Sequence, residues 1–257
     1  MSVSEARRPS AGTTNSNNPT ECHSKQVKQK LEGVRSRKLK EAGHARSDSG
    51  YEPNFFPEDV IQEVLCENTI RYVLGCPCND CSDHATFLPE GCSMDRTDYC
   101  RDIIRDNARG LLALLVVIDH PALIGGFLQH RSEHVDTILT ADLDREALKN
   151  YLPNIGTKRT EGEVRGFLNL FLIERLQFSP PTFKTNRYER LDPQDVFPFI
   201  NTTKIGSGGY GNVYSFQFYP GYLEWDEFKD LVGSPAPARD DVEMLTCIRD
   251  SRRRNSL

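Results

Sequence analysis

The sequence predicts an α+β fold, in which a mainly helical domain is followed by a short β-hairpin. Two observations lead to this prediction. Apolar residues recur at helical spacing in several segments between residues 54 and 181, and a glycine-rich turn lies between two β-prone segments at residues 204–218. The first 53 residues are mostly small, polar or basic, which predicts a disordered basic tail before the helical domain.

Composition and charge restrict which partners and which cellular locations we expect for this protein. The chain has 257 residues and a net charge of −5, which argues against a nucleic-acid partner. The most apolar run, residues 110–118, is far shorter than the roughly 20 residues that span a bilayer, and no apolar signal segment stands at the start. We therefore expect an intracellular protein, cytoplasmic or nuclear, whose eight cysteines stay reduced and form no disulfide framework.

The tail contains one patterned stretch. Val27, Leu31 and Val34 lie at helical spacing within a run of lysines and arginines, which predicts a short helix there. Such a run is typical of a nuclear-import or polyanion-binding segment, but it is equally typical of a solvated basic tail. We favour the second interpretation.

Five helical segments are expected in residues 54–181. They begin near Pro57, Thr97, Pro121, Thr140 and Glu161. Their apolar faces are too extensive to stay in water, so they pack on one another or on a protein partner that the sequence does not identify. The predicted core residues are Leu112, Leu115, Val116, Phe167, Leu168 and Phe171. Residues 182–203 read as an extended linker, in which Phe197 and Phe199 dock onto the rest of the chain.

A G-x-G-x-x-G-x-V motif follows the linker at Gly206–Val213. In dinucleotide-binding proteins the last glycine opens a helix, whereas here β-prone residues follow it, so that interpretation fails. A strand–turn–strand setting suits a loop that covers nucleotide phosphates, because glycines let the backbone approach them closely. The candidate nucleotide-binding residues are Ile205, Gly206, Ser207, Gly208, Gly209, Tyr210, Gly211 and Val213.

With this loop the chain resembles the N-terminal part of a fungal-type protein kinase. "DVFPFINTTKIGSGGYGNVYSFQF" resembles the junction between the helical region and the catalytic domain of that family, and the likeness covers roughly residues 55–218. The resemblance implies ATP with magnesium as cofactor and phosphoryl transfer to Ser or Thr as the reaction. It also implies that residues 204–257 are a truncated kinase N-lobe.

Other kinase elements are missing or doubtful. The sequence contains neither H-R-D nor D-F-G, so we expect no catalysis by this chain alone. Lys229, in the candidate third strand Phe228–Leu231, is either the ATP-binding lysine or a solvated lysine in an acidic segment. Residues 239–250 resemble the following helix, in which Asp241 or Glu243 would hold that lysine. The rival hypothesis is a non-enzymatic helical interaction module that has lost its kinase domain.

A cysteine-rich stretch lies inside the helical region. Cys76, Cys78, Cys81 and His84 fall within nine residues and are candidate zinc ligands, and Cys92 or Cys100 is an alternative fourth ligand. The spacing fits no standard zinc pattern, so free thiols in a loop remain the alternative. A redox pair of Cys78 and Cys81 is disfavoured, because no thioredoxin-like βαβ pattern surrounds it.

Overall fold

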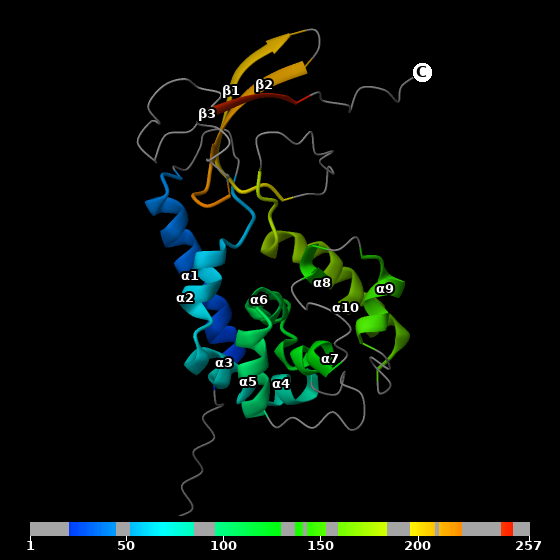
Figure 1. Cartoon of the computed structure of the whole chain (residues 1–257). Helices are drawn as coiled ribbons and strands as arrows, with labels where there is room; N and C mark the ends of the chain where they lie inside the picture. Colours follow the sequence, from blue (N-terminus) through cyan, green and yellow to red (C-terminus); the bar gives the residue numbers. More distant parts are fainter. Residues whose placement is uncertain are drawn as a thin grey trace, which may run out of the picture.

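The computed structural model describes residues 21–44, 52–84, 96–129, 137–140, 143–152, 159–183, 196–208, 211–222 and 243–248. A helical module lies beside a small antiparallel β-sheet (Figure 1), which confirms the α+β prediction. None of the helices in these ranges combines the length and the apolar character that crossing a membrane requires.

The helical elements follow one another along the chain, with two short 3₁₀ turns among them, and the strands come last. The helices are α1 (His23–Glu41), α2 (Glu58–Val64), α3 (Glu67–Leu74), α4 (Asn79–His84), α5 (Arg96–Arg105), α6 (Arg109–Val117), α7 (Ile124–Gln129), α8 (Thr137–Thr140), α9 (Arg145–Tyr151) and α10 (Glu161–Glu174). The 3₁₀ turns are Pro121–Leu123 and Arg175–Phe178. The strands are β1 (Phe199–Gly208), β2 (Gly211–Phe218) and β3 (Glu243–Ile248).

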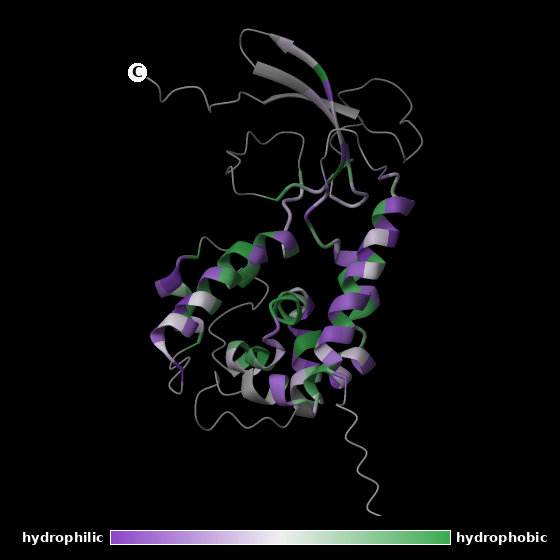
Figure 2. Ribbon diagram, turned by 180° about the vertical axis from the view of Figure 1, so that it is seen from behind, coloured by the Kyte–Doolittle hydropathy of each residue, from purple (hydrophilic) through white to green (hydrophobic). Residues whose placement is uncertain are grey.

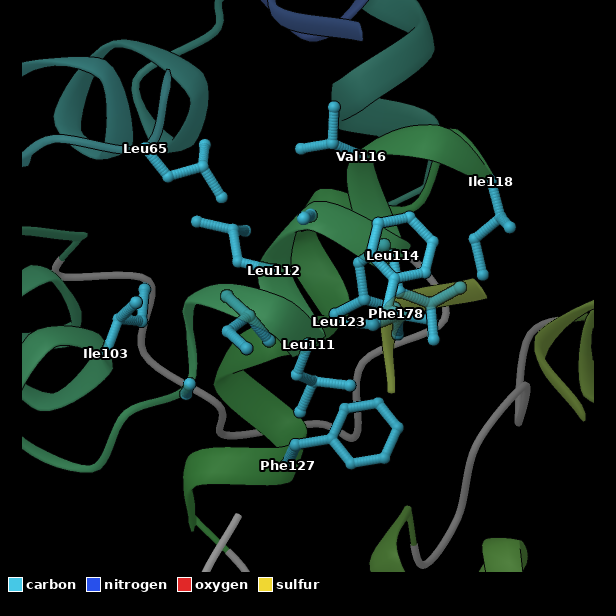
Figure 3. Close-up of a cluster of buried hydrophobic side chains, with 14 of the residues drawn as sticks. Leu65, Ile103, Leu111, Leu112, Leu114, Val116, Ile118, Leu123, Phe127 and Phe178 are labelled. Carbon is cyan, nitrogen blue, oxygen red and sulfur yellow. The ribbon is translucent and has the colours of Figure 1, made fainter. Parts of the chain in front are cut away.

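Helix α6 is the centre of the helical module. Every residue from 111 to 116 is buried, so this helix is apolar on all sides and must be enclosed by its neighbours. Figure 3 shows Leu111, Leu112 and Leu114 pointing into the shared core beside Phe127 and Phe178. The predicted core is confirmed, because the six side chains named from the sequence are all buried: Leu112, Leu115, Val116, Phe167, Leu168 and Phe171.

The predicted helix over residues 97–118 is two helices. Asn107 has a φ of 52°, a left-handed conformation that ends α5, and α6 starts two residues later. The break lets the apolar faces of both helices turn into the same core. Thr97, which was expected to cap this helix, lies within α5 instead. Asparagine adopts this conformation more readily than most residues, so Asn107 was the available signal.

Helix α10 carries the strongest local start signal. The side chain of Thr160 accepts from the backbone N–H of Glu163, whose carboxylate in turn accepts from the N–H of Thr160. On its inner face Phe171 stacks on Phe127 with 5.5 Å between ring centroids. The helix is thus fixed both at its start and along its buried side.

The prediction of a disordered tail over residues 1–53 is wrong for residues 23–41, which form α1. The spacing of Val27 and Leu31 was the correct signal, because both are buried in the core of the helical module. The basic residues lie around this narrow stripe. Arg35 shows how one of them is used: its guanidinium lies 4.8 Å from the centre of the Phe56 ring and donates to the carbonyl of Pro53.

Two glycines of α1 should respond oppositely to substitution by alanine. Gly33 lies in mid-helix with open space where a Cβ would go, so Gly33→Ala should stabilise the chain by about 0.5–1 kcal/mol. Gly43 closes the helix in a Schellman motif, with φ +94°, and its N–H and that of His44 bond the carbonyls of Lys40 and Leu39. Gly43→Ala should destabilise by about 1 kcal/mol. Thermal unfolding of both variants checks this pair, and equal effects of one sign would contradict it.

The sheet has the strand order β1-β2-β3, with both neighbouring pairs antiparallel. The glycine-rich turn is at its open end, where Gly208 pairs with Gly211. The predicted extended linker, residues 182–203, ends earlier than expected, because β1 already begins at Phe199. As expected, Phe197 and Phe199 dock: their rings stack at 5.3 Å, and Phe199 stacks on Phe216 at 4.4 Å.

The helix predicted at residues 239–250 is contradicted by β3. Residues 243–248 pair with β2, with Glu243 opposite Gln217 and Cys247 opposite Val213. For the segment Glu-Met-Leu-Thr-Cys-Ile, β2 offers an open row of backbone hydrogen-bonding groups, and pairing with it decides the structure. The strand that the structure describes beside β2 is Glu243–Ile248. The candidate strand Phe228–Leu231, with Lys229, and the candidate partner Asp241 lie outside the described residues.

Candidate metal centre and glycine-rich turn

Four cysteine sulfurs converge at one end of the helical module. The Sγ atoms of Cys22, Cys76, Cys78 and Cys81 all lie within 4.8 Å of one another, and we call this group the four-cysteine cluster. Three of the residues are buried and Cys78 is half-buried. The sulfurs of Cys22 and Cys81 are 3.6 Å apart, well beyond the roughly 2.05 Å of a disulfide bond.

Local structure explains how these cysteines meet. Cys22 is the N-cap residue of α1, and Cys76 follows directly after Gly75, the residue that ends α3. Cys78 precedes α4 and Cys81 lies in its first turn. The helical start of α4 turns the C-x-x-C pair back on itself, so that the N–H of Cys81 donates to the sulfur of Cys78 (3.4 Å).

Backbone donors also surround Cys76. The N–H of His23 donates to its sulfur (3.3 Å), and His23 in turn stacks on Tyr72 of α3 with ring centroids 3.6 Å apart. Burial opposes ionisation of Cys76, but backbone N–H groups of Cys78 and His23 outweigh it and lower the pKa of this thiol to about 7. Burial raises the pKa of Cys78 and Cys81. One sulfur is thus prepared to be a thiolate near neutral pH.

Ser24 supplies a further sign that this site fits a metal. Its side chain is 2% exposed, and its Oγ has no hydrogen-bond partner among the described residues. It lines, with Cys22 and Cys81, a cleft of about 460 Å³ that reaches the cluster. A buried hydroxyl without an acceptor costs about 1–3 kcal/mol. A metal-bound thiolate would provide an acceptor in the same cleft, and the cleft would provide an entry path.

The spacing of the sulfurs suits one ion. Zinc–sulfur bonds of about 2.3 Å in a tetrahedron place the sulfurs about 3.8 Å apart. The pair Cys22–Cys81 already has that spacing, and the widest separation, up to 4.8 Å, requires an inward shift of about 1 Å. The four-cysteine cluster can therefore hold a single metal ion such as zinc.

Three of the four predicted ligands, Cys76, Cys78 and Cys81, converge as expected, and Cys22, which was not predicted, joins them. The side chain of His84, the predicted fourth ligand, lies outside what the structure describes. Cys100 is buried elsewhere, with its sulfur 3.7 Å from the carbonyl of Glu67. Cys92 lies outside the described residues. Cys22 was missed because its whole segment was assigned to a disordered tail.

The glycine-rich turn is described in part. Ile205 is 53% exposed on β1, at an irregularity in the register between Lys204 and Gly206. A Cβ on Gly206 would meet nothing within 4 Å, so that position is open to a ligand. Ser207 pairs with Asn212 and Gly206 with Val213. Gly209 and Tyr210, at the tip, lie outside the described residues, as does the side chain of Val213.

No lysine stands on the described third strand. Its residues 243–248 read EMLTCI, so the position next to β2 that would offer an ammonium group to nucleotide phosphates carries none. Glu243, the candidate partner of such a lysine, pairs with Gln217, six residues along β2 from Gly211. At about 3.3 Å per residue it lies about 20 Å from the turn. The described residues thus provide a glycine-rich turn without the charged pair that the kinase resemblance implies.

Comparison with known proteins adds no relative. No family model, no curated protein and no solved structure matches this chain.

Proposed function

We propose that this chain is a zinc-binding helical module that carries a glycine-rich sheet of the protein-kinase type. The observation that carries the proposal is the convergence of Cys22, Cys76, Cys78 and Cys81 from three separate helix ends. Four thiolates in tetrahedral reach select zinc, and sulfurs within 4.8 Å of one another enclose one ion rather than a larger iron–sulfur cluster.

The role of this zinc is structural. Four protein ligands occupy all four coordination positions of a tetrahedral zinc ion and leave none for water or substrate, in contrast to catalytic sites with three protein ligands. The ion would tie the start of α1 to the end of α3 and to α4. Besides the cysteines, these helices are joined here by the His23–Tyr72 stack, a hydrogen bond from Tyr72 to Gln26 and the exposed Lys25–Asp80 ion pair.

Metal analysis of the purified full-length chain tests the proposal. After dialysis against metal-free buffer under reducing conditions, we expect roughly one zinc ion per chain by mass spectrometry of the elements. Iron in place of zinc, or zinc far below one per chain after refolding with added zinc, would contradict it.

The kinase resemblance gives the glycine-rich turn a second candidate function, the binding of nucleotide phosphates, which we expect this chain not to perform productively on its own. It is supported by the motif Gly206–Val213 and by the antiparallel order β1-β2-β3 around it. By resemblance the cofactor is ATP with magnesium and the reaction is phosphoryl transfer to Ser or Thr. The third strand without a lysine, and a sequence without H-R-D or D-F-G, support a chain that is catalytically incomplete.

MgATP should therefore leave the thermal unfolding of this chain unchanged at millimolar concentration. The reason is that backbone N–H groups of the turn alone compensate little phosphate charge. A midpoint that rises with MgATP concentration would contradict this expectation. If the midpoint does rise, Gly206→Val shows whether the turn is the binding site. The valine side chain enters open space, so the variant keeps the fold but blocks a phosphate at the turn.

A further inference from the structure

Helix α1 runs from the four-cysteine cluster at its first residue to the glycine-rich sheet at its last turn (Figure 1). Its 19 residues rise about 28 Å. A continuous ladder of backbone hydrogen bonds makes such a helix a stiff connection, so that a change in the position of one end is felt at the other.

The N-terminal end of α1 lacks the usual means of fixing a helix start. Its N-cap residue, Cys22, makes no side-chain cap hydrogen bond, and the first turn contains no acidic residue. Lys25 adds a positive charge where the partial charge of the helix terminus is already positive, and it pairs with Asp80 of α4 (2.9 Å) at the exposed surface. A metal-bound thiolate at Cys22 would place negative charge at this end and hold it against α3 and α4.

The middle of α1 is held by few apolar contacts. Figure 2 shows the helix as mainly hydrophilic, and along it the buried side chains are Ser24, Val27, Leu31 and Leu39. Val34 packs partly on the same core, and Arg35 contacts the Phe56 ring and the Pro53 carbonyl. The ion pairs of Lys28 and Arg37 with neighbouring elements lie at the surface and contribute little.

The C-terminal end of α1 is where the sheet is attached. Leu39 packs with Phe55, Ile200 and Tyr219 in a small core of its own, separate from the core around α6. Asn201 of β1 donates to the carbonyl of Gly43 (3.0 Å), immediately after the helix.

Further polar contacts extend this attachment. A ring nitrogen of His44 lies 2.5 Å from the carbonyl oxygen of Ile200. Lys38 of α1 pairs with Asp59 of α2 (3.3 Å), and Asp59 accepts from the hydroxyl of Tyr219 (3.0 Å). Burial raises the pKa of Tyr219, so it stays a donor. The last turn of α1, its cap and the start of α2 together form the seat of the sheet.

We infer that metal binding at the four-cysteine cluster controls the attachment of the glycine-rich sheet to the helical module, with α1 as the connecting element. The inference rests on the proposed zinc binding. When the metal leaves, the start of α1 loses its link to Cys76, Cys78 and Cys81, the helix opens, and the seat formed by its last turn opens with it. The sheet then separates from the module or becomes mobile on it.

Amide hydrogen exchange of the full chain tests the inference. Zinc-loaded and chelator-stripped samples are compared at equal pH, with metal content measured in each. Stripping should speed exchange at least tenfold at the N–H of His44, which bonds Leu39, and at the N–H of Tyr219, which bonds Pro198. Amides in the middle of α10 should change less than twofold, because α10 does not touch the cluster.

A break in the middle of α1 provides the matched variant. Glu32→Pro interrupts the helix between its two ends, and Glu32→Ala is the control at the same exposed site. The proline variant should keep its zinc but exchange at Tyr219 as fast as the stripped wild type, with no further change on stripping.

The outcomes separate the two proposals. A chain that binds no zinc refutes the proposed function. If the chain binds zinc but the amides of His44 and Tyr219 stay protected after stripping, the coupling alone is refuted. The four-cysteine cluster then stabilises only the helix ends around it. If stripping removes protection at residues 23–31 and nowhere else, the coupling alone is likewise refuted.

Discussion

Cys22→Ser lowers the zinc affinity of the chain by more than about 100-fold, because loss of an outer partner of a metal ligand alone already costs about 10–100-fold. The substitution removes the one ligand that α1 contributes and leaves the C-x-C and C-x-x-C pairs intact. Competition with a chromophoric zinc chelator measures the affinity, and thermal unfolding with and without zinc should show that the stabilisation by zinc is largely lost.

Cys66→Ser is the matched control for this substitution. Cys66 is exposed, it bonds Thr69 and it lies outside the cluster. Its replacement should leave zinc affinity within about threefold of the wild type, the range of surface substitutions of up to about 0.5 kcal/mol. An equal loss in both variants would show that Cys22 is not a ligand.

Phe171→Ala destabilises the helical module by about 3–5 kcal/mol, the range for removing a fully buried aromatic side chain. Phe171 is 0% exposed and contacts Phe127 and Phe167, so its loss leaves a cavity beside α6. For a chain of this size the unfolding midpoint should fall by about 6–20 °C.

Ile173→Ala is the control on the same helix. Ile173 is 65% exposed, so this substitution should change the stability by no more than about 0.5 kcal/mol. Comparable losses in the two variants would contradict the orientation of α10 and with it the location of the core.

The helical core was predictable because it depends on local pattern. Apolar residues at helical spacing identified the buried faces of α6 and α10, and burial of Leu112 and Phe171 follows from that pattern alone. Helix ends were less predictable. Asn107 ends α5 through a backbone conformation that asparagine tolerates but does not require.

The fourth metal ligand was not predictable, because it depends on distant contacts. Cys22 is 54 residues before Cys76 in the chain, and only the packing of Val27 and Leu31 on the helical module brings it to the cluster. The sequence showed an incomplete set of three close cysteines, but nothing in their spacing selects Cys22 over His84 or Cys100.

The strand at residues 243–248, where a helix was expected, was missed for a related reason. Residues 243–248 carry no alternation that separates a strand from a helix, and the pairing with β2 decides the outcome. The glycine-rich turn itself was predicted with the correct strands on both sides, because the glycines and the β-branched and aromatic residues around them are local signals.

X-ray absorption at the zinc edge of the metal-loaded full-length chain tests the central claim most directly. The proposed centre predicts a single shell of four sulfur neighbours at about 2.3 Å and no nitrogen neighbour. A shell of three sulfurs with one nitrogen at about 2.0 Å would mean that a histidine replaces one of the four cysteines, which would contradict the centre described here.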